Sequence, residues 1–450
     1  MVLQYERYLG MPAMVGRSKE RAFSSLKDRI AKKLQGWNEK FLSKAGREVL
    51  IKAIAQSIPT FTMSCFRLPK GFCDDVNAMI AKFWWGSSSC VRKIHWKKWL
   101  HLCTSKEDGG LGFRDFHAFN LALLGKQGWR FIQDPYSLVY RVCKARYFPN
   151  SSFMDAKAGT NPSLIWRSIL SARDTIQAGM MWKVGDGRTI KIWEDKWLPC
   201  TPARKQNGPN VTFVRELIDE DRGWWNESII DATFDVKSAQ VIKQMALCNF
   251  NSPDRARWKE TTSGEYSVSS AYALELKRQK PQDGGESSNS EELKGMWRRI
   301  WKLKIPGKVR HFLWRACNET LPTSQNLQRR KIMVDPRCRI CDGEVETTTH
   351  ILWECPLANS VWSLVKGKIQ KCHVSNEEFQ HITRALVGAL PRAELEGWAI
   401  VSWSIWNARN RYIHEGIQAC PSDIVDKGLG VLQEFQNCQS VQVQSSGILV

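Results

Sequence analysis

The chain has 450 residues, too many for one ordinary domain, and its length predicts about three. A hydrophobic content of 43% and a charged content of 25% are typical of folded proteins and exclude wholesale disorder. No stretch approaches the ~20 apolar residues that span a bilayer, and the first residues carry no secretory signal, so we expect an intracellular protein without a membrane partner. Its fourteen cysteines are then expected as reduced thiols, and a cluster of them would favour a metal site.

The formal net charge is +21, and the basic excess is concentrated in two windows. Residues 1–130 hold 23 basic and 10 acidic residues, and residues 294–340 hold 13 basic and 2 acidic residues. Clustered Lys and Arg favour a polyanion such as RNA or DNA, because they release counterions from phosphates. A solvated surface is the alternative that the composition leaves open.

The first 130 residues predict several helices in chain order. Residues 18–60 predict two of them, the second with Ser43 as its N-cap. The face that this second helix is expected to bury is Val49, Leu50, Ala53 and Ile54. A third helical pattern runs through Val76, Ile80, Phe83 and Trp84. Residues 106–115 (KEDGGLGFRD) follow as a glycine-broken loop without the Lys-Ser/Thr of a phosphate loop.

Asp74 and Asp75 follow Phe72 and Cys73 in the aromatic-x-Asp-Asp pattern of a polymerase active site. Such a pair holds divalent metals when it lies on a hairpin and a third carboxylate comes from another strand. Here a helical pattern follows the pair directly, so we interpret it as the acidic first turn of a helix. We therefore predict no catalytic residue and no small-molecule substrate.

The rest of the chain mixes one β-hairpin with further helices. Residues 182–197 predict a hairpin with a tight turn at residues 185–187 (GDG). Residues 294–330 are again helical in pattern, and residues 390–412 predict a Trp-rich helix. No internal repeat is found.

The clearest chemical signal is the motif Cys338-x2-Cys341-x8-His350-x4-Cys355. Three thiolates and one imidazole complete a tetrahedral zinc site, and four protein ligands leave no open position for a substrate. We therefore predict one structural Zn2+ ion, against the alternative of four unrelated residues in a cysteine-rich chain. Cys372 and His373 lie close by in the sequence as spare ligands.

Cations surround the tryptophans just before this motif, and they are the candidates for contact with nucleic acid. They are Lys302, Lys304, Lys308, Arg310, Arg315, Arg329, Arg330 and Lys331. A solvated face that only keeps the region soluble is the alternative for any one of them.

An ordered string of further motifs runs through nearly the whole chain. Upstream they are 8–10, Pro12, Trp37, 42–47, 50–52, Pro59, Met63, Phe66, 68–69, 83–86, 94–96, Trp99, 102–103, 109–112, 114–115, 119–120, 122–124 and 129–130. Downstream they are Trp258, 264–268, 271–272, Trp297, Trp301, 305–308, 312–314, 321–323, 326–327 and Arg330 before the four ligands, and Pro356 and Trp362 after them. This string resembles plant non-LTR (LINE-type) retrotransposon reverse transcriptases, and its downstream part resembles their zinc-binding domain.

The resemblance implies a mainly α, multidomain fold with four parts. Residues 1–130 would be a helical, thumb-like region after the polymerase palm, and 131–257 a mixed connector with the small β-hairpin. Residues 258–365 would be a small, α-rich zinc-binding module, and 366–450 a helical linker towards a ribonuclease H domain. The palm that precedes the motif at 8–10 in that family, and the ribonuclease H domain that often follows residues 403–410, are not expected within this chain.

Three functions remain open on the sequence. The first is a retrotransposon-derived fragment, without catalysis of its own, that binds RNA or DNA beside a structural zinc. The second is a truncated gene model of an active RNA-directed DNA polymerase, which an upstream reading frame with the remaining polymerase motifs would favour. The third is a zinc-dependent module that binds protein. The resemblance implies a nuclear location.

Overall fold

The computed structural model describes residues 7–8, 11–12, 19–38, 42–86, 93–219, 221–247, 252–279, 290–371 and 378–446. Within these residues the fold is mainly α-helical, as expected, with small two-stranded antiparallel sheets. The chain forms two compact units, each assembled from separate stretches of sequence. Unit 1 comprises Met1–Arg29, Ile58–Val76 and Asp115–Gln282, and unit 2 comprises Ile30–Ser57, Asn77–Arg114 and Asp283–Val450. The division into four parts stays a prediction.

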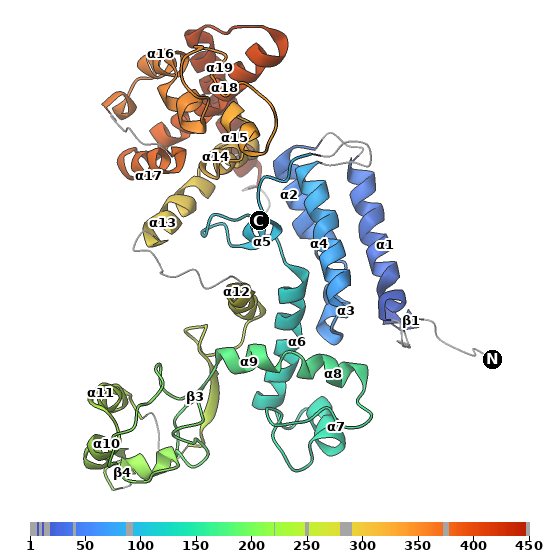
Figure 1. Ribbon diagram of the computed structural model, residues 1–450, viewed down its shortest axis with the longest axis vertical. Helices are drawn as coiled ribbons and strands as arrows, with labels where there is room; N and C mark the ends of the chain where they lie inside the picture. Colours follow the sequence, from blue (N-terminus) through green and yellow to red (C-terminus); the bar gives the residue numbers. More distant parts are fainter. Residues whose placement is uncertain are drawn as a thin grey trace, which may run out of the picture. The chain divides into compact units, whose positions relative to one another are not determined.

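Helices of unit 1 surround α6 (Phe116–Gln133), and a second group of short elements follows β3 (Figure 1). In chain order the other elements of unit 1 are β1 (Arg7–Tyr8), β2 (Met11–Pro12), the first part of α1 (Lys19–Asn38), α3 (Thr60–Cys65), the first part of α4 (Lys70–Trp85), α7 (Leu138–Tyr147), α8 (Leu164–Leu170), α9 (Arg173–Gly179), β3 (Met180–Lys183), β4 (Ile218–Asp219), β5 (Trp224–Trp225), α10 (Glu227–Thr233), α11 (Val236–Gln244), β6 (Arg255–Trp258) and α12 (Val268–Gln279).

The core of unit 1 is aromatic and packs beneath α6. Trp129 of α6 meets Trp258 of β6 edge to face, with ring centroids 5.6 Å apart. Buried Asn120 of the same helix donates from its side chain to the carbonyls of Met63 and Phe66. These hydrogen bonds join the end of α3 to α6, because a buried amide left without partners would be costly.

The sheet in the connector differs from the expected hairpin. β3 pairs antiparallel with β6, with Met180 opposite Trp258, and not with residues 190–197. Within residues 182–197 the Trp182 N–H does donate to the Lys196 carbonyl, so the segment turns back but forms no paired strands. The predicted hairpin over 182–197 is therefore wrong in its strand pairing, because the partner of β3 is β6. Asp254, next to β6, explains the difference, because its carboxylate accepts from three backbone N–H groups of the turn at 185–189 and draws that turn to β6.

Unit 2 contains the sequence motif of the predicted metal site. Its elements are the second part of α1, α2 (Lys44–Leu50), a π-helical turn (Ile51–Ala55), the second part of α4, α5 (Trp99–Cys103), α13 (Ser290–Trp301), α14 (Gly307–Cys317), α15 (Ser324–Arg329), a second π-helical turn, η3 (His350–Glu354), α16 (Pro356–Leu364), α17 (Phe379–Ala389), α18 (Arg392–Glu415) and α19 (Pro421–Ser446). Among the described helices of the chain, none is both long and apolar enough to cross a membrane.

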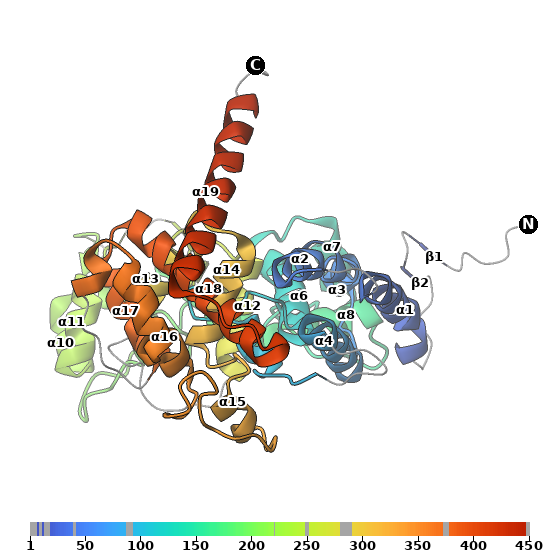
Figure 2. The same cartoon turned by 90° about the horizontal axis from the view of Figure 1, so that it is seen from above.

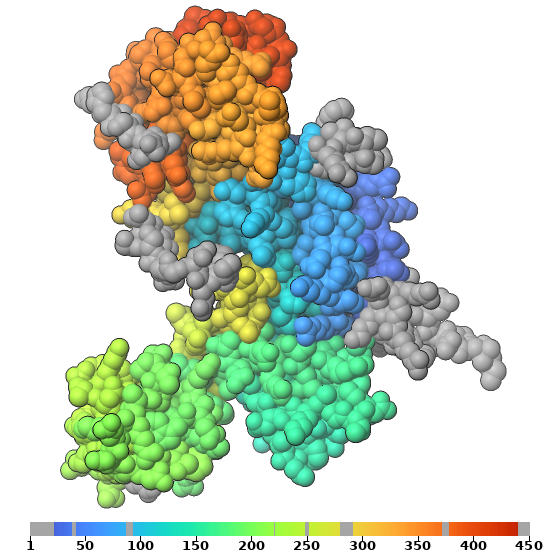
Figure 3. Space-filling model, viewed as in Figure 1, coloured from blue at the N-terminus to red at the C-terminus, as the bar shows by residue number. Residues whose placement is uncertain are grey.

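α14 and α18 lie at the centre of unit 2. α14 packs against α2, α17 and α18, and α18 lies alongside α19, whose C-terminal end projects from the unit (Figure 2). In the space-filling view the orange residues and the red-orange residues that follow them in the chain form one continuous mass (Figure 3). The side chains of α14 that face this core include Val309, Leu313 and Trp314, all fully buried.

The glycine-broken loop at 106–115 serves packing. Trp314 donates from Nε1 to the carbonyl of Gly109 at 2.8 Å. A Cβ at Gly110 would lie 2.2 Å from the carbonyl oxygen of Thr104, and Gly109 has a φ of +81°. Both positions therefore need glycine, the first because of a close approach and the second because of a left-handed backbone.

The helix capped by Ser43 buries a different face from the predicted one. Ser43 caps α2 as expected, accepting from the Gly46 N–H. However, Val49 is 62% exposed, whereas Glu48 and Ile51 are buried. The apolar pattern was misleading because the face of α2 turned towards α14 carries the carboxylate of Glu48, which accepts from His311 of α14 and pairs with Lys52.

Asp74 and Asp75 lie on a helix and not on a hairpin. Both are exposed on α4, which begins at Lys70, so they lie just beyond its first turn. Asp75 forms an ion pair with Lys27 of α1 at 2.5 Å. This surface arrangement is not the cluster of carboxylates that a two-metal site requires.

Candidate metal centre and nucleic-acid surface

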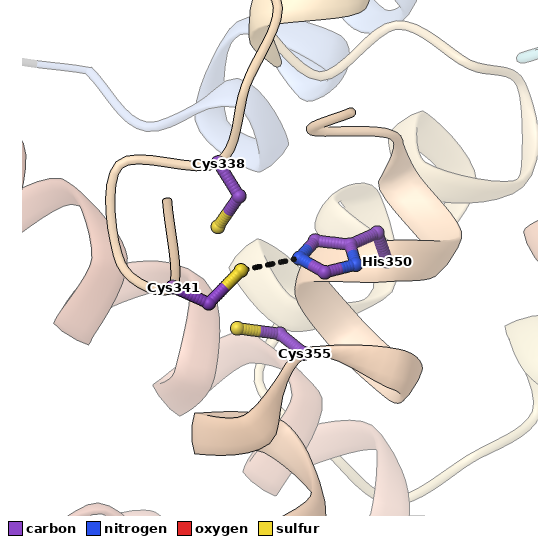
Figure 4. A group of neighbouring side chains, drawn as sticks. All are labelled: Cys338, Cys341, His350 and Cys355. Atoms are coloured by element: carbon purple, nitrogen blue, oxygen red, sulfur yellow. Dashed lines mark hydrogen bonds between the residues drawn. The ribbon is translucent and has the colours of Figure 1, made fainter. Parts of the chain in front are cut away.

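Cys338 and Cys341 lie on a tight turn between α15 and η3. The Asp342 N–H donates to the Cys338 carbonyl at 2.8 Å, and the Cys338 N–H donates to the Glu344 carbonyl at 2.8 Å. Asp342 has a φ of +52°, which an aspartate tolerates better than most residues. The turn folds the two cysteines back so that both thiols face the same point (Figure 4).

His350 and Cys355 mark the two ends of the π-helical turn η3. In an α-helix, side chains five residues apart point about 140° away from one another. Here the Cys355 N–H donates to the His350 carbonyl at 2.7 Å, the i→i+5 bond of a π-helix. This wider turn brings the imidazole and the thiol to the same side. Pro356 begins α16 and requires an extended backbone at Cys355, which ends the turn there.

The four candidate ligands converge on one point (Figure 4). Their ligand atoms all lie within 4.8 Å of one another, and Cys341 Sγ lies 3.4 Å from His350 Nε2. A tetrahedral zinc site with Zn–S bonds of about 2.3 Å has ligand atoms about 3.8 Å apart, so the cluster fits one zinc ion. Cys338, His350 and Cys355 are buried, which matches a closed site.

Hydrogen bonds within the cluster shift the pKa values of Cys338 and His350. The hydrogen bond with Cys355, followed by burial, raises the pKa of Cys338 to about 12. The hydrogen bond with Cys338 raises the pKa of His350 to about 8, against the opposing effect of burial. Zinc binds thiolates and neutral imidazole, so its binding here would release protons. The donor set is that of a soft or borderline metal. Cys372 and His373 lie outside the described residues.

Five of the eight candidate cations are exposed and make no ion pair within the described part of the chain: Lys302, Lys304, Lys308, Arg329 and Lys331. The first three lie in or beside the connection from α13 to α14. Lys308 also lies over the ring of Trp403 in α18, with Nζ 4.4 Å from the centroid. This cation–π contact holds the lysine in place while its charge stays in solvent.

The other three candidates have structural partners. Arg310 is half-buried and donates to the Trp301 carbonyl. Arg315 is half-buried and donates to the Thr320 carbonyl. Arg330 is exposed, but it donates to the Trp96 carbonyl at 2.5 Å. The structure therefore does not bring all eight cations together as one free surface.

The sequence patterns did not single out a buried ion pair, one partner of which, Glu346, lies between Cys341 and His350 in the chain. Arg409 of α18 donates to the carboxylate of Glu346 at 2.5 Å, and Glu346 is fully buried. Glu346 also accepts from the Ser324 N–H, at the start of α15. One available signal was an arginine in the apolar, Trp-rich stretch of 390–412, since a buried arginine requires a carboxylate partner.

Comparison with known proteins agrees with this site. Residues 266–362 match the family described as zinc-binding in reverse transcriptase, a range that includes all four ligands. The chain is 47% identical over 143 residues to an uncharacterized mitochondrial protein of Arabidopsis thaliana, covering 32% of this chain and 93% of that protein. It is also 30% identical over 415 residues to an Arabidopsis thaliana protein named "Putative ribonuclease H protein", covering 89% of this chain.

The chain belongs to the plant proteins related to retrotransposon reverse transcriptases. The resemblance inferred from the sequence motifs is confirmed at this level. This reverse-transcriptase relative spans 65% of the length of the ribonuclease H-named protein that it matches. Its cluster of three cysteines and one histidine lies in the part of the chain that the zinc-binding family covers.

Proposed function

We propose that this chain is a zinc-stabilised, nucleic-acid-binding part of a retrotransposon-derived protein of the non-LTR (LINE) type. Cys338, Cys341, His350 and Cys355 would hold one structural zinc ion. The observation that carries the nucleic-acid partner is the set of exposed lysines at 302, 304 and 308, without an ion pair in the described part of the chain, on the short connection from α13 to α14 and at the start of α14. The name of the ribonuclease H relative supports the same class of partner.

Side chains of α18 hold the backbone of the connection that bears these lysines. Glu396 of α18 accepts from the Lys304 N–H at 2.6 Å, and Arg392 donates to the Lys302 carbonyl at 2.7 Å. The backbone is held while the three ammonium groups stay exposed and without an ion pair in the described part of the chain, which suits contacts to phosphates. Such contacts give binding that is weakly dependent on sequence and strongly dependent on salt.

Zinc would act on this surface through structure. It would tie the turn at 338–341 to η3 and to the start of α16, and these elements pack with α18 and α19. A site with four protein ligands supplies no open coordination position, so we assign the metal no part in hydrolysis. We assign no catalytic role to the carboxylates of Asp74 and Asp75.

The test compares nucleic-acid binding by the full chain at several salt concentrations. The triple variant Lys302→Gln, Lys304→Gln, Lys308→Gln should weaken RNA and DNA binding to a similar degree for different sequences. Each lost phosphate contact lowers the slope of log K against log salt by about 0.7–0.9, so the triple variant should lose about two units. Arg310 is left in place because it supports the backbone of α13.

The matched control is Lys183→Gln, Lys237→Gln, Lys277→Gln, which removes the same charge from exposed positions in unit 1. This control should bind nearly as tightly as the parent. Equal binding by the parent and the 302–308 variant at every salt concentration would refute the assignment of this surface. Binding that is insensitive to salt would favour the protein-interaction alternative.

A further inference from the structure

A cavity of about 300 Å3 opens in unit 2, and one of its lining residues, Arg339, lies between Cys338 and Cys341 in the sequence. Arg315 of α14, Leu327 of α15, Arg339 of the metal-binding turn, and Trp406, Arg409 and His414 of α18 line it. Its volume is at the lower end of the range for small-molecule pockets, about 300–1,000 Å3. Neither the zinc cluster nor the lysines at 302–308 lie among its lining residues.

Positive charge dominates the lining. Arg409 is neutralised, because Glu346 accepts from its Nη2 and Nε and is buried beneath it. Within the described part of the chain no carboxylate pairs with Arg315 or Arg339. The cavity therefore holds at least two guanidinium groups in excess over acidic groups.

Arg315 has hydrogen-bonding capacity left over. It donates from Nη2 to the Thr320 carbonyl, but its Nε is buried and without a partner in the structure. Burial lowers the pKa of Arg315 to about 10, so the group is still charged at neutral pH. A partly buried cation with further cations around it favours an anionic ligand.

The other walls indicate what the anion carries with it. Leu327, Val334 and Ile413 supply apolar surface beside the arginines. The guanidinium of Arg409 already lies over a ring of Trp406, with Cζ 4.9 Å from the centroid. That ring face is therefore occupied and does not stack on a base. A small site whose lining combines arginines with aliphatic carbons fits a phosphate with one attached nucleoside. It does not fit the middle of a duplex.

We infer that this cavity binds a terminal phosphate monoester, either at the end of a nucleic-acid strand or on a free mononucleotide. Arg315 and Arg339 would contact the phosphate, and the aliphatic wall would contact the sugar or base. Arg339 lies between Cys338 and Cys341, so the turn that would hold zinc also positions this arginine. This inference rests on the proposed function and adds an end-recognition site to it.

The experiment uses the zinc-loaded full chain and short oligonucleotides of one sequence, with either a 5′-phosphate or a 5′-hydroxyl. We expect the phosphorylated strand to bind about tenfold more tightly, the effect of roughly one charge-assisted hydrogen bond. Arg339→Gln should abolish this preference. Arg337→Gln is the matched control, because Arg337 is exposed on the same turn, pairs with Asp335 and lies outside the cavity lining.

Competition distinguishes the two sources of the phosphate. If adenosine 5′-monophosphate displaces the phosphorylated strand, free nucleotides also enter the cavity. If only 5′-phosphorylated oligonucleotides displace it, the site recognises strand ends. Equal binding of the two oligonucleotides by the parent, or equal weakening by Arg337→Gln and Arg339→Gln, would overturn the inference.

The outcome is separable from that of the proposed function. Salt-dependent binding without a preference for the phosphorylated end would leave the lysine surface intact and remove the cavity site. The converse result is that the chain binds adenosine 5′-monophosphate but no longer strand. That result would support the phosphate site in the cavity and refute the lysine surface.

Discussion

His311 of α14 donates from Nε2 to Oε2 of Glu48 in α2, at 2.9 Å. Both side chains are buried, and the other oxygen of Glu48 accepts from Lys52 and Lys106 at 2.7 and 2.8 Å. His311 lies inside the range that matches the zinc-binding family, whereas Glu48 lies far upstream of it. Residues outside the family match therefore complete the core of unit 2 around α14.

Removing the charge of Glu48 should destabilise unit 2. Glu48→Gln removes the negative charge that His311, Lys52 and Lys106 share and replaces one acceptor oxygen by an NH2 donor, so we expect a loss of about 2–3 kcal/mol in the free energy of unfolding. Urea denaturation of the full chain measures it. Glu107→Gln is the control, because Glu107 forms only an exposed ion pair with Arg298 and should change stability little. Similar effects of the two substitutions would contradict the buried role of Glu48.

Stability should also fall as the medium becomes acidic. Burial lowers the pKa of His311, so below the ordinary value of about 6.5 the unfolded chain binds the proton more readily than the folded one. Burial alone would raise the pKa of Glu48, but hydrogen bonds from His311, Lys106 and Lys52 outweigh it and hold that pKa well below its usual range. The contribution of Glu48 is therefore present above about pH 4.3 and is lost as the pH falls towards its folded value.

The variant His311→Gln isolates the first step, since its amide can still donate to Glu48. Unfolding free energies between pH 8 and pH 5 should decline less steeply in this variant than in the parent. If the parent instead gains stability towards acid, His311 is protonated and forms an ion pair, and the assignment of a neutral imidazole is wrong.

Zinc removal should unfold the part of unit 2 around the metal cluster. Structural zinc supplies apparent binding free energies of about 10–16 kcal/mol in zinc-finger peptides, comparable to the stability of a domain. Cys338→Ser and Cys355→Ser should lose the metal and act like a chelator. Cys317→Ser should keep it, because Cys317 is a buried thiol that contacts Thr383 in another part of the core. Elemental analysis measures the metal, and a folded protein without stoichiometric metal would refute the site.

The chain by itself should not extend a primer on a template with magnesium or manganese. Asp74 and Asp75 are exposed on a helix, and one of them pairs with Lys27. A two-metal site needs several carboxylates held together. Primer extension that disappears in Asp74→Asn would contradict this expectation.

Gly110→Ala should destabilise unit 2 by about 1–3 kcal/mol, the usual effect of overpacking. Its Cβ would lie 2.2 Å from the backbone oxygen of Thr104, which cannot move without disturbing the loop that receives Trp314. Gly388→Ala is the control, because a Cβ there meets nothing within 4 Å and alanine favours a helix. Thermal unfolding compares the two, and a tolerated Gly110→Ala would show that the loop is not closely packed.

The local sequence determined most helices and which four side chains form the Cys/His cluster. Val76, Ile80, Phe83 and Trp84 follow one face of a helix, and all four are buried in α4. The cap at Ser43 was predictable because a serine hydroxyl satisfies a free N–H at a helix start. The Cys and His spacing identified the metal cluster because few other arrangements bring three thiols and an imidazole to one point.

Only the tertiary structure decided how distant segments meet. No periodicity indicates that α2 would turn Glu48 and not Val49 to the core, since that choice depends on His311 and two lysines elsewhere in the chain. β3 likewise pairs with β6 because the carboxylate of Asp254, next to β6, accepts from backbone N–H groups of the turn at 185–189, which follows β3. The π-helical turn that begins at His350 is also held from outside, because Trp362 of α16 donates from Nε1 to the Leu352 carbonyl at 2.9 Å. Local preferences act over a few residues, whereas these features depend on partners that only the folded chain brings close.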